Sequence, residues 1–166
     1  LFPYTTLFRS VMAVCPVLRP HSTMRALEEG LWVYRAYFLR RWRRSLLAKA
    51  ECFPDLYEFG DLRRLPTLTA TTEFFVTRYA GFQDLDSYLA GYAITGDALA
   101  GLTVPSRIIA AADDPVIPID DLQDVAVTSS LQIDVIPHGG HCAFIESLSL
   151  RSWVDRAVQG EIESAL

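Results

Sequence analysis

Two apolar runs, each followed by a polar loop, lie in and around the stretch Ile108–Phe144 and constrain the fold more than any other part of the chain. Arg107–Ala112 leads into an Asp-Asp-Pro loop, and Leu131–Pro137 leads into a His-Gly-Gly-His loop. The segment between them, Pro118–Val127, has helical spacing. Short β-branched runs bounded by Pro and Gly are typical of strands, and runs this apolar suit a parallel sheet covered on both faces. The stretch therefore predicts an α/β fold.

A carboxylate follows the first run, and an imidazole follows the second. Asp114 precedes Pro115, which disfavours helical backbone at Asp114 and holds it in a loop. His141 follows two glycines, which allow a tight turn and leave room for the ring. In a parallel sheet both loops lie beyond the carboxyl ends of the strands, where functional residues gather. A carboxylate that orients an imidazole, which in turn serves a nucleophile, is typical of catalytic triads.

Residues next to Asp114 and His141 suggest alternative roles for the same two loops. We expect Asp113 to hydrogen-bond within its loop, and His138 is the lesser candidate for the base. A metal site made from His138, His141, Cys142, Asp113 and Asp114 is a further alternative. Zinc ligands usually come as better-separated pairs than this His-x-x-His spacing, so we predict no metal site.

Several segments give the chain a family resemblance. Most of Val11–Val158 resembles the YheT-like branch of the α/β-hydrolases. The pair of motifs D-D-P-x-x-P and G-G-H-x-x-F is fairly specific for the fold, and the intervening segments indicate the branch. The segments that carry the resemblance are Tyr88–Phe144, with Gly91–Gly96, Ala110–Pro118 and Gly139–His141, and the earlier Tyr37–Lys49 and Cys52–Pro54.

The resemblance implies a fold and an activity. It implies the C-terminal half of an α/β-hydrolase fold, in which parallel strands are flanked by helices. Residues 21–102 would be a helical lid or cap, and residues 103–166 would carry the acid and the base. By the same resemblance Asp114 is the triad acid, His141 is the general base, and the substrate is a carboxylic ester with an acyl chain. No metal or organic cofactor is implied.

The nucleophile of that family is missing from the sequence. It lies in a G-x-S-x-G elbow, and none of the nine glycines belongs to such a motif. We therefore expect residues 11–166 to be a partial domain whose nucleophile and oxyanion hole lie upstream. Residues 1–10, LFPYTTLFRS, match the translation of a sequencing adapter, and we expect them to be an artefact of that origin. The alternatives are an apolar N-terminal strand for residues 1–10, and a non-catalytic hydrolase-like scaffold for the whole chain.

A basic, aromatic helix is predicted from Leu31 to about Cys52. Its apolar stripe consists of Leu31, Tyr34, Phe38, Trp42 and Leu46. Six of the fifteen basic residues lie on it, namely Arg35, Arg40, Arg41, Arg43, Arg44 and Lys49. We interpret it as a packed helix with a solvated basic face. A membrane-surface module built on Arg35–Lys49 is the alternative.

Composition narrows the function classes. A net charge of −5 disfavours general nucleic-acid binding. Three cysteines at unrelated spacings predict no disulfide framework and a reducing compartment, so we expect a cytoplasmic protein, with peripheral membrane contact through Arg35–Lys49 as the alternative. No apolar run has the length of a membrane span.

The remaining elements are predicted from spacing and caps. Val11–Cys15 is predicted as a strand. Helices are expected from Met24 with a Ser22 or Thr23 cap, over Thr67–Tyr79, from an Asp84 or Asp86 cap to Tyr92, and over Ser149–Leu166, with a turn at Gly96–Leu102. The aromatic residues between the first two strands would either hold an acyl chain or form a core.

Overall fold

The computed structural model describes residues 9–165, so most of the segment 1–10 lies outside the described residues. The chain divides into two compact units. One consists of the residues up to Leu18 together with those from Ile94 onward, and the other consists of Arg19–Ala93. The predicted lid region ran over nearly the same residues as the second unit, from 21 to 102.

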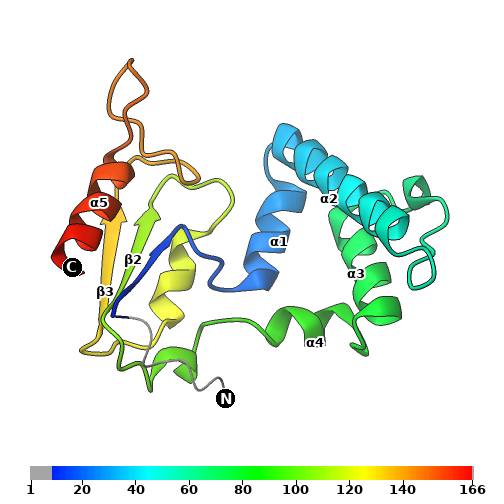
Figure 1. Cartoon of the computed structure of the whole chain (residues 1–166), viewed down its shortest axis with the longest axis horizontal. Helices are drawn as coiled ribbons and strands as arrows, with labels where there is room; N and C mark the ends of the chain where they lie inside the picture. The colour runs from blue at the N-terminus through cyan, green and yellow to red at the C-terminus, as the bar shows by residue number, and fades with distance from the viewer. Residues whose placement is uncertain (1–8, 166) are drawn as a thin grey trace. The chain divides into compact units, whose positions relative to one another are not determined.

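Within residues 9–165, the first unit is built on a three-stranded parallel sheet in the order β1-β2-β3. The strands are β1 (Val11–Val14), β2 (Ser106–Ala111) and β3 (Leu131–Ile136) (Figure 1). Val11 pairs with Ser106, and Ser106 pairs with Leu131, so the three strands run in register. The predicted strands and the mixed α/β class are confirmed.

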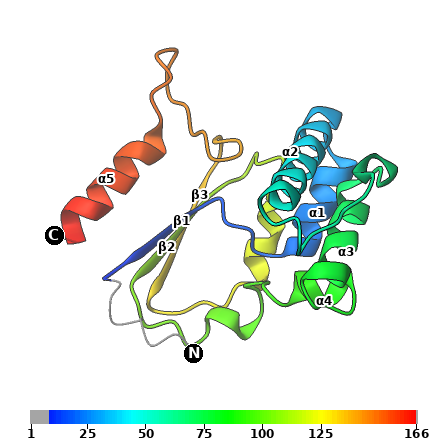
Figure 2. The same cartoon turned by 45° about the vertical axis from the view of Figure 1, so that its right-hand side comes forward.

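The two faces of this sheet are covered by different elements. Side chains alternate along a strand, so Ile108 and Arg107 of β2 face opposite sides. Ile108 packs with Leu18 and Val125 beside the 3₁₀ helix η3 (Ile119–Asp124). On the other face Arg107 pairs with Asp134 of β3 and lies 3.6 Å from Glu161 of the last helix, α5 (Trp153–Ala165). Figures 1 and 2 show α5 and η3 on opposite sides of the sheet.

Two predicted helices of this unit differ from the structure. The segment Pro118–Val127 forms only η3, a short 3₁₀ helix that ends where Val125 adopts extended backbone. The closing helix begins at Trp153 rather than near Ser149, and Leu150, which lies in the predicted helical range, is exposed and has a positive φ of 59°. The turn at Gly96–Leu102 contains a second 3₁₀ helix, η2 (Asp97–Leu99).

The second unit is helical. Its elements are α1 (Pro20–Glu29), α2 (Trp32–Cys52), the 3₁₀ helix η1 (Leu62–Arg64), α3 (Leu68–Tyr79) and α4 (Leu85–Ala90) (Figure 2). Thr67 caps α3, and Asp84, one of the two predicted cap residues, caps α4. The predicted cap of α1 is wrong. Pro20 occupies its first turn, where a missing N–H costs nothing, and Ser22 instead donates to the Arg19 carbonyl.

Aromatic residues form much of the core of the second unit. Leu46, Phe59 and Leu62 are buried together, and Trp42, Tyr57, Phe75 and Tyr79 are among the aromatic residues that pack against them. The rings contact one another edge-on or stacked, for example Trp42 with Phe75 at 5.6 Å between centroids. These rings therefore act as core. The stripe predicted on α2 is only partly buried, because Leu46 is enclosed while Leu31 is 63% exposed.

Candidate functional site

The carboxylate of Asp114 is held by its own loop beyond β2. Its Oδ1 accepts hydrogen bonds from the backbone N–H groups of Val116 and Ile117 at 2.8 and 3.0 Å. Its Oδ2 lies 3.0 Å from Nδ1 of His141. The Asp114 side chain is 1% exposed, whereas that of His141 is 30% exposed. Both oxygens of a buried carboxylate are thus satisfied, as burial of a charge requires. The structure brings the two predicted residues together.

The loop that carries His141 is packed from beneath by Phe144. A Cβ at Gly139 would lie 2.4 Å from Cε1 of the buried Phe144 ring, so this position has no space for a side chain. Gly140 has a φ of 54°, which favours glycine. The N–H of Phe144 donates to the Gly139 carbonyl at 2.9 Å and closes the turn. The first glycine therefore makes room for Phe144, and the second permits the turn that presents the imidazole.

Asp113 joins the two loops, as expected of a loop carboxylate. Its Oδ1 accepts from the N–H groups of Gly139 and Gly140, each at 2.8 Å. These hydrogen bonds lower the pKa of the Asp113 carboxyl. His138 lies 3.6 Å from the same carboxylate and is 90% exposed. The solvated His138 has no buried partner of the kind that His141 has.

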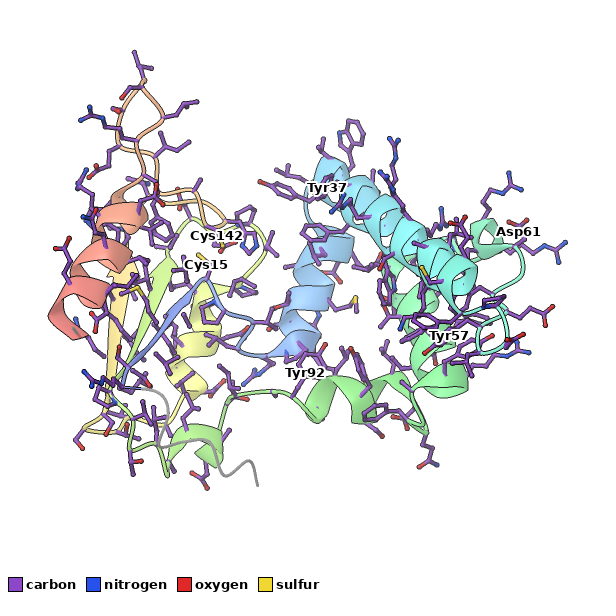
Figure 3. The ribbon with its side chains drawn as sticks, in the orientation of Figure 1. Cys15, Tyr37, Tyr57, Asp61, Tyr92 and Cys142 are labelled. Atoms are coloured by element: carbon purple, nitrogen blue, oxygen red, sulfur yellow. The ribbon has the colours of Figure 1, made fainter. Side chains whose placement is uncertain are left out.

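Two cysteines lie beside His141. Cys15 directly follows β1, and Cys142 follows His141 (Figure 3). The two Sγ atoms and a ring nitrogen of His141 all lie within 4.8 Å of one another. Burial raises the pKa of the Cys15 thiol to about 12, and burial also raises the pKa of Cys142. Neither thiol is therefore an activated nucleophile, since that requires a lowered pKa.

Backbone strain gathers at the same place. Among the described residues, four that are not glycine have a positive φ, and three of these are Cys15, Cys142 and Phe144. Such conformations cost free energy, and they persist where the surrounding structure holds them, commonly at functional sites. The carboxyl end of the sheet is thus the strained region of the first unit.

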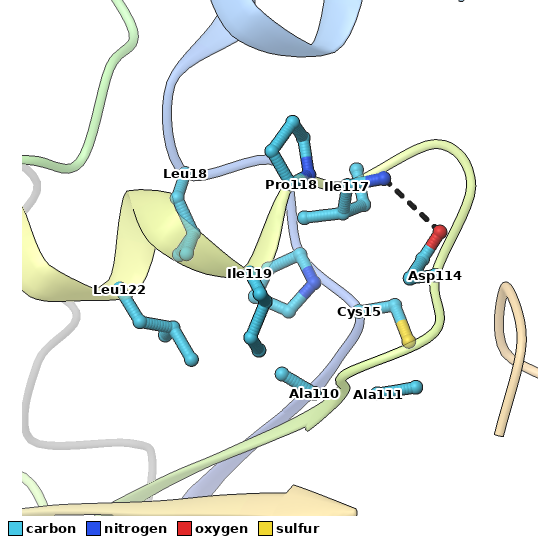
Figure 4. Close-up of a pocket in the computed structure, with 10 residues that line it drawn as sticks. Cys15, Leu18, Ala110, Ala111, Asp114, Ile117, Pro118, Ile119 and Leu122 are labelled. Atoms are coloured by element: carbon cyan, nitrogen blue, oxygen red, sulfur yellow. Dashed lines mark hydrogen bonds between the residues drawn. The ribbon is translucent and has the colours of Figure 1, made fainter. Parts of the chain in front are cut away.

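A small, mostly apolar pocket adjoins the acid (Figure 4). Cys15 and Asp114 are at one end of it, and Ile117, Ile119 and Leu122 line much of the rest. The dashed line in Figure 4 marks the hydrogen bond from the Ile117 N–H to Asp114. These apolar walls keep water from the carboxylate, which strengthens its contact with the imidazole.

Reasoning from the sequence missed Cys15. The set considered for a metal was His138, His141, Cys142, Asp113 and Asp114, whereas the described residues whose ligand atoms converge are Cys15, His141 and Cys142. The usable signal was its place at the end of a predicted strand. The rule that gathered Asp114 and His141 beyond the carboxyl ends of parallel strands applies equally to Cys15.

No protein-family model matches the chain, and no curated protein sequence matches it. In the part of the chain that the structure describes, none of the helices combines the length and the apolar character needed to cross a membrane.

Proposed function

We propose that Asp114 and His141 are the acid and base of a serine-type carboxylic ester hydrolase of the α/β-hydrolase class, acting on acyl esters. The observation that carries the proposal is the 3.0 Å contact between Asp114 Oδ2 and His141 Nδ1. A buried carboxylate on Nδ1 fixes the tautomer and leaves Nε2 to exchange a proton with a nucleophile. This geometry supports a catalytic role for the pair.

The chemistry follows from the two ring nitrogens. Nε2 of His141 takes the proton of a serine hydroxyl as the oxygen attacks the ester carbonyl. The same proton then passes to the alcohol oxygen as the ester bond breaks and an acyl-enzyme forms. Water, deprotonated by Nε2, then attacks the acyl-enzyme, and the proton returns to the serine oxygen as the acid leaves. Asp114 stabilises the imidazolium through its contact with Nδ1.

The nucleophile would come from outside the printed sequence. Within residues 9–165 the side chain of His141 is hydrogen-bonded to Asp114 and not to a serine. In this proposal the parallel strands are the C-terminal part of the hydrolase sheet, and Arg19–Ala93 is the lid inserted after β1. The aromatic core of that unit would keep the lid folded, and the ester would be held elsewhere.

The experiment extends the reading frame upstream of the Val11 codon and assays the longer protein on a chromogenic acyl ester. We expect an in-frame Gly-x-Ser-x-Gly and measurable turnover. His141→Ala and Asp114→Asn should each lower kcat by about 10⁴-fold. The matched control is His138→Ala, which changes an exposed His three residues away and should leave kcat unchanged.

Two results would overturn this function. One is full turnover in a folded His141→Ala protein, with folding checked by circular dichroism. The other is a continuous coding sequence with no serine elbow, which would favour a scaffold in which Asp114 and His141 serve only the fold.

The second candidate function is binding of α2 to a membrane surface. The exposed apolar and aromatic side chains at the start of the helix favour it. Trp32, Val33 and Tyr37 at the start of α2 are all more than half exposed, with Arg35 and Arg41 on the same helix. Exposed aromatic residues beside basic ones suit an anionic bilayer surface. We expect Trp32 fluorescence to shift to the blue on anionic vesicles at low ionic strength and not on neutral ones. An unchanged spectrum would dispose of this candidate.

A further inference from the structure

We propose that Cys15, His141 and Cys142 form a binding site for a soft divalent metal ion of the zinc class. The proposal concerns three side chains from two loops that the sheet brings together. It assigns a use to the two thiols, which the proposed hydrolysis does not employ. It also adds a regulatory consequence, since the ion would take the His141 nitrogen that the base needs; this consequence alone rests on the proposed function.

The donor set is the first support. Two thiolates and one imidazole make a Cys₂His set, which zinc binds in proteins, and soft sulfur ligands disfavour magnesium and calcium. The two Sγ atoms and one ring nitrogen of His141 already lie within 4.8 Å of one another. In a tetrahedral site with Zn–S bonds of about 2.3 Å, neighbouring donors are about 3.7 Å apart. Closure therefore requires the donors to move closer together, which side-chain rotation supplies.

Asp114 is the second support. Metal-bound histidines usually donate their other ring N–H to a carboxylate, which fixes the tautomer and raises the basicity of the ligand. His141 donates from Nδ1 to Asp114 at 3.0 Å, so Nε2 is the nitrogen available to an ion. Asp114 is in turn anchored by two backbone N–H groups. The ring tautomer is thus fixed as in metal-bound histidines before any ion arrives.

The local backbone is the third support. Cys15 and Cys142 both have positive φ values, 44° and 67°, which side-chain-bearing residues rarely adopt. Cys15 is buried and Cys142 is exposed. An ion can therefore enter from the Cys142 side, and three protein ligands leave a fourth position for water. Binding releases both thiol protons to solvent and leaves two sulfur–metal bonds.

A bound metal ion and the proposed ester hydrolysis both require the lone pair on Nε2 of His141. An ion on Nε2 of His141 leaves no lone pair to take a serine proton. Zinc at saturating concentration should therefore stop ester turnover in the longer protein, and a chelator should restore it.

The test uses Co²⁺ as the probe, on the chain as printed, with a reducing agent that does not bind metals. We expect a thiolate-to-cobalt charge-transfer band in the near ultraviolet and the visible bands of tetrahedral Co²⁺. Cys142→Ser removes an exposed ligand with little risk to folding, and it should weaken the thiolate band. His141→Ala should abolish tetrahedral binding, and Asp114→Asn should weaken it by about 10–100-fold.

Matched controls separate the site from adventitious binding. Cys52→Ser changes the third, exposed cysteine, and His138→Ala changes the neighbouring exposed His. Both variants should bind Co²⁺ as the parent chain does. The absence of a thiolate band, or a band that Cys52→Ser removes and Cys142→Ser leaves intact, would overturn the site. Because cobalt binding is read without ester turnover, a bound ion in a longer protein that hydrolyses no ester sustains the site and refutes the hydrolase.

Discussion

Gly139 shows how a single residue sets the position of the base. Its missing side chain is the space that the Phe144 ring fills, and Phe144 in turn closes the loop that carries His141. The family-like motif G-G-H-x-x-F thus has a packing reason inside this chain, independent of any relative. The Phe144 ring can pack at this position only because residue 139 is a glycine.

Gly139→Ala should lower the free energy of unfolding by about 1–3 kcal/mol, because a Cβ there forces a buried ring to move. Urea denaturation of the parent and the variant measures this loss. Gly101→Ala is the control, since a Cβ at that exposed glycine meets no atom within 4 Å and should change stability little. Equal stability of the Gly139 variant and the parent would contradict the packing account.

Cys15 predicts a pH dependence of stability. Its thiol pKa rises from the ordinary 9.0 to about 12 on folding, because burial disfavours the thiolate. Between about pH 9 and 12 the unfolded chain loses this proton while the folded chain keeps it, so the contribution of Cys15 to stability is complete below pH 9 and falls as pH rises. Cys15→Ala removes this component. The difference in unfolding free energy between parent and variant should therefore narrow above pH 9, and a constant difference would contradict the assignment.

Among the elements, α2 depends on one buried side chain. Leu46 is 0% exposed in the aromatic cluster, whereas its neighbour Leu47 is 50% exposed. Leu46→Ala should cost about 2–5 kcal/mol through lost burial and the cavity that remains. Leu47→Ala on the same helix should cost much less. Thermal denaturation followed by helical ellipticity compares the two, and similar losses would show that α2 is not anchored through Leu46.

The strands were predictable, whereas the form of η3 and the start of α5 were not. β-branched runs between prolines and glycines placed β2 and β3 within a residue of their observed ends. The pattern of Pro118–Val127 looked helical because Ile119, Leu122 and Val125 share one side, yet a 3₁₀ turn presents the same spacing of three. Apolar spacing likewise placed the start of α5 too early, since Leu150 is exposed.

The sequence predicted the contact between Asp114 and His141 in the candidate site, but it did not predict that Cys15 lies beside them. Asp114 and His141 follow consecutive strands, so the topology alone brings them close. The contact of Cys15 with the His loop depends on the pairing of β1 with β2, which sets Val14 opposite Ile109. Register between strands so far apart in the chain leaves no mark in local spacing.

At the scale of the whole molecule, the feature that bears on association is the sheet edge formed by β1. In the described chain β1 pairs with β2 on one side, and Val11 at its start is 44% exposed. An open strand edge invites pairing with another chain. We expect concentration-dependent association in sedimentation experiments, reduced by Val11→Lys. Val127→Lys, at an exposed loop position outside β1, is the control. A monomer at every concentration would contradict this expectation.

The contact between Asp114 and His141 carries both the proposed hydrolysis and the proposed metal site, so its direct measurement comes first. Nitrogen-15 NMR of the His141 ring, at a pH where the ring is neutral, reports which nitrogen carries the proton. The structure predicts the Nδ1–H tautomer, with a slowly exchanging downfield proton that Asp114→Ala abolishes. An Nε2–H tautomer, or a ring signal that Asp114→Ala leaves unchanged, would contradict the account.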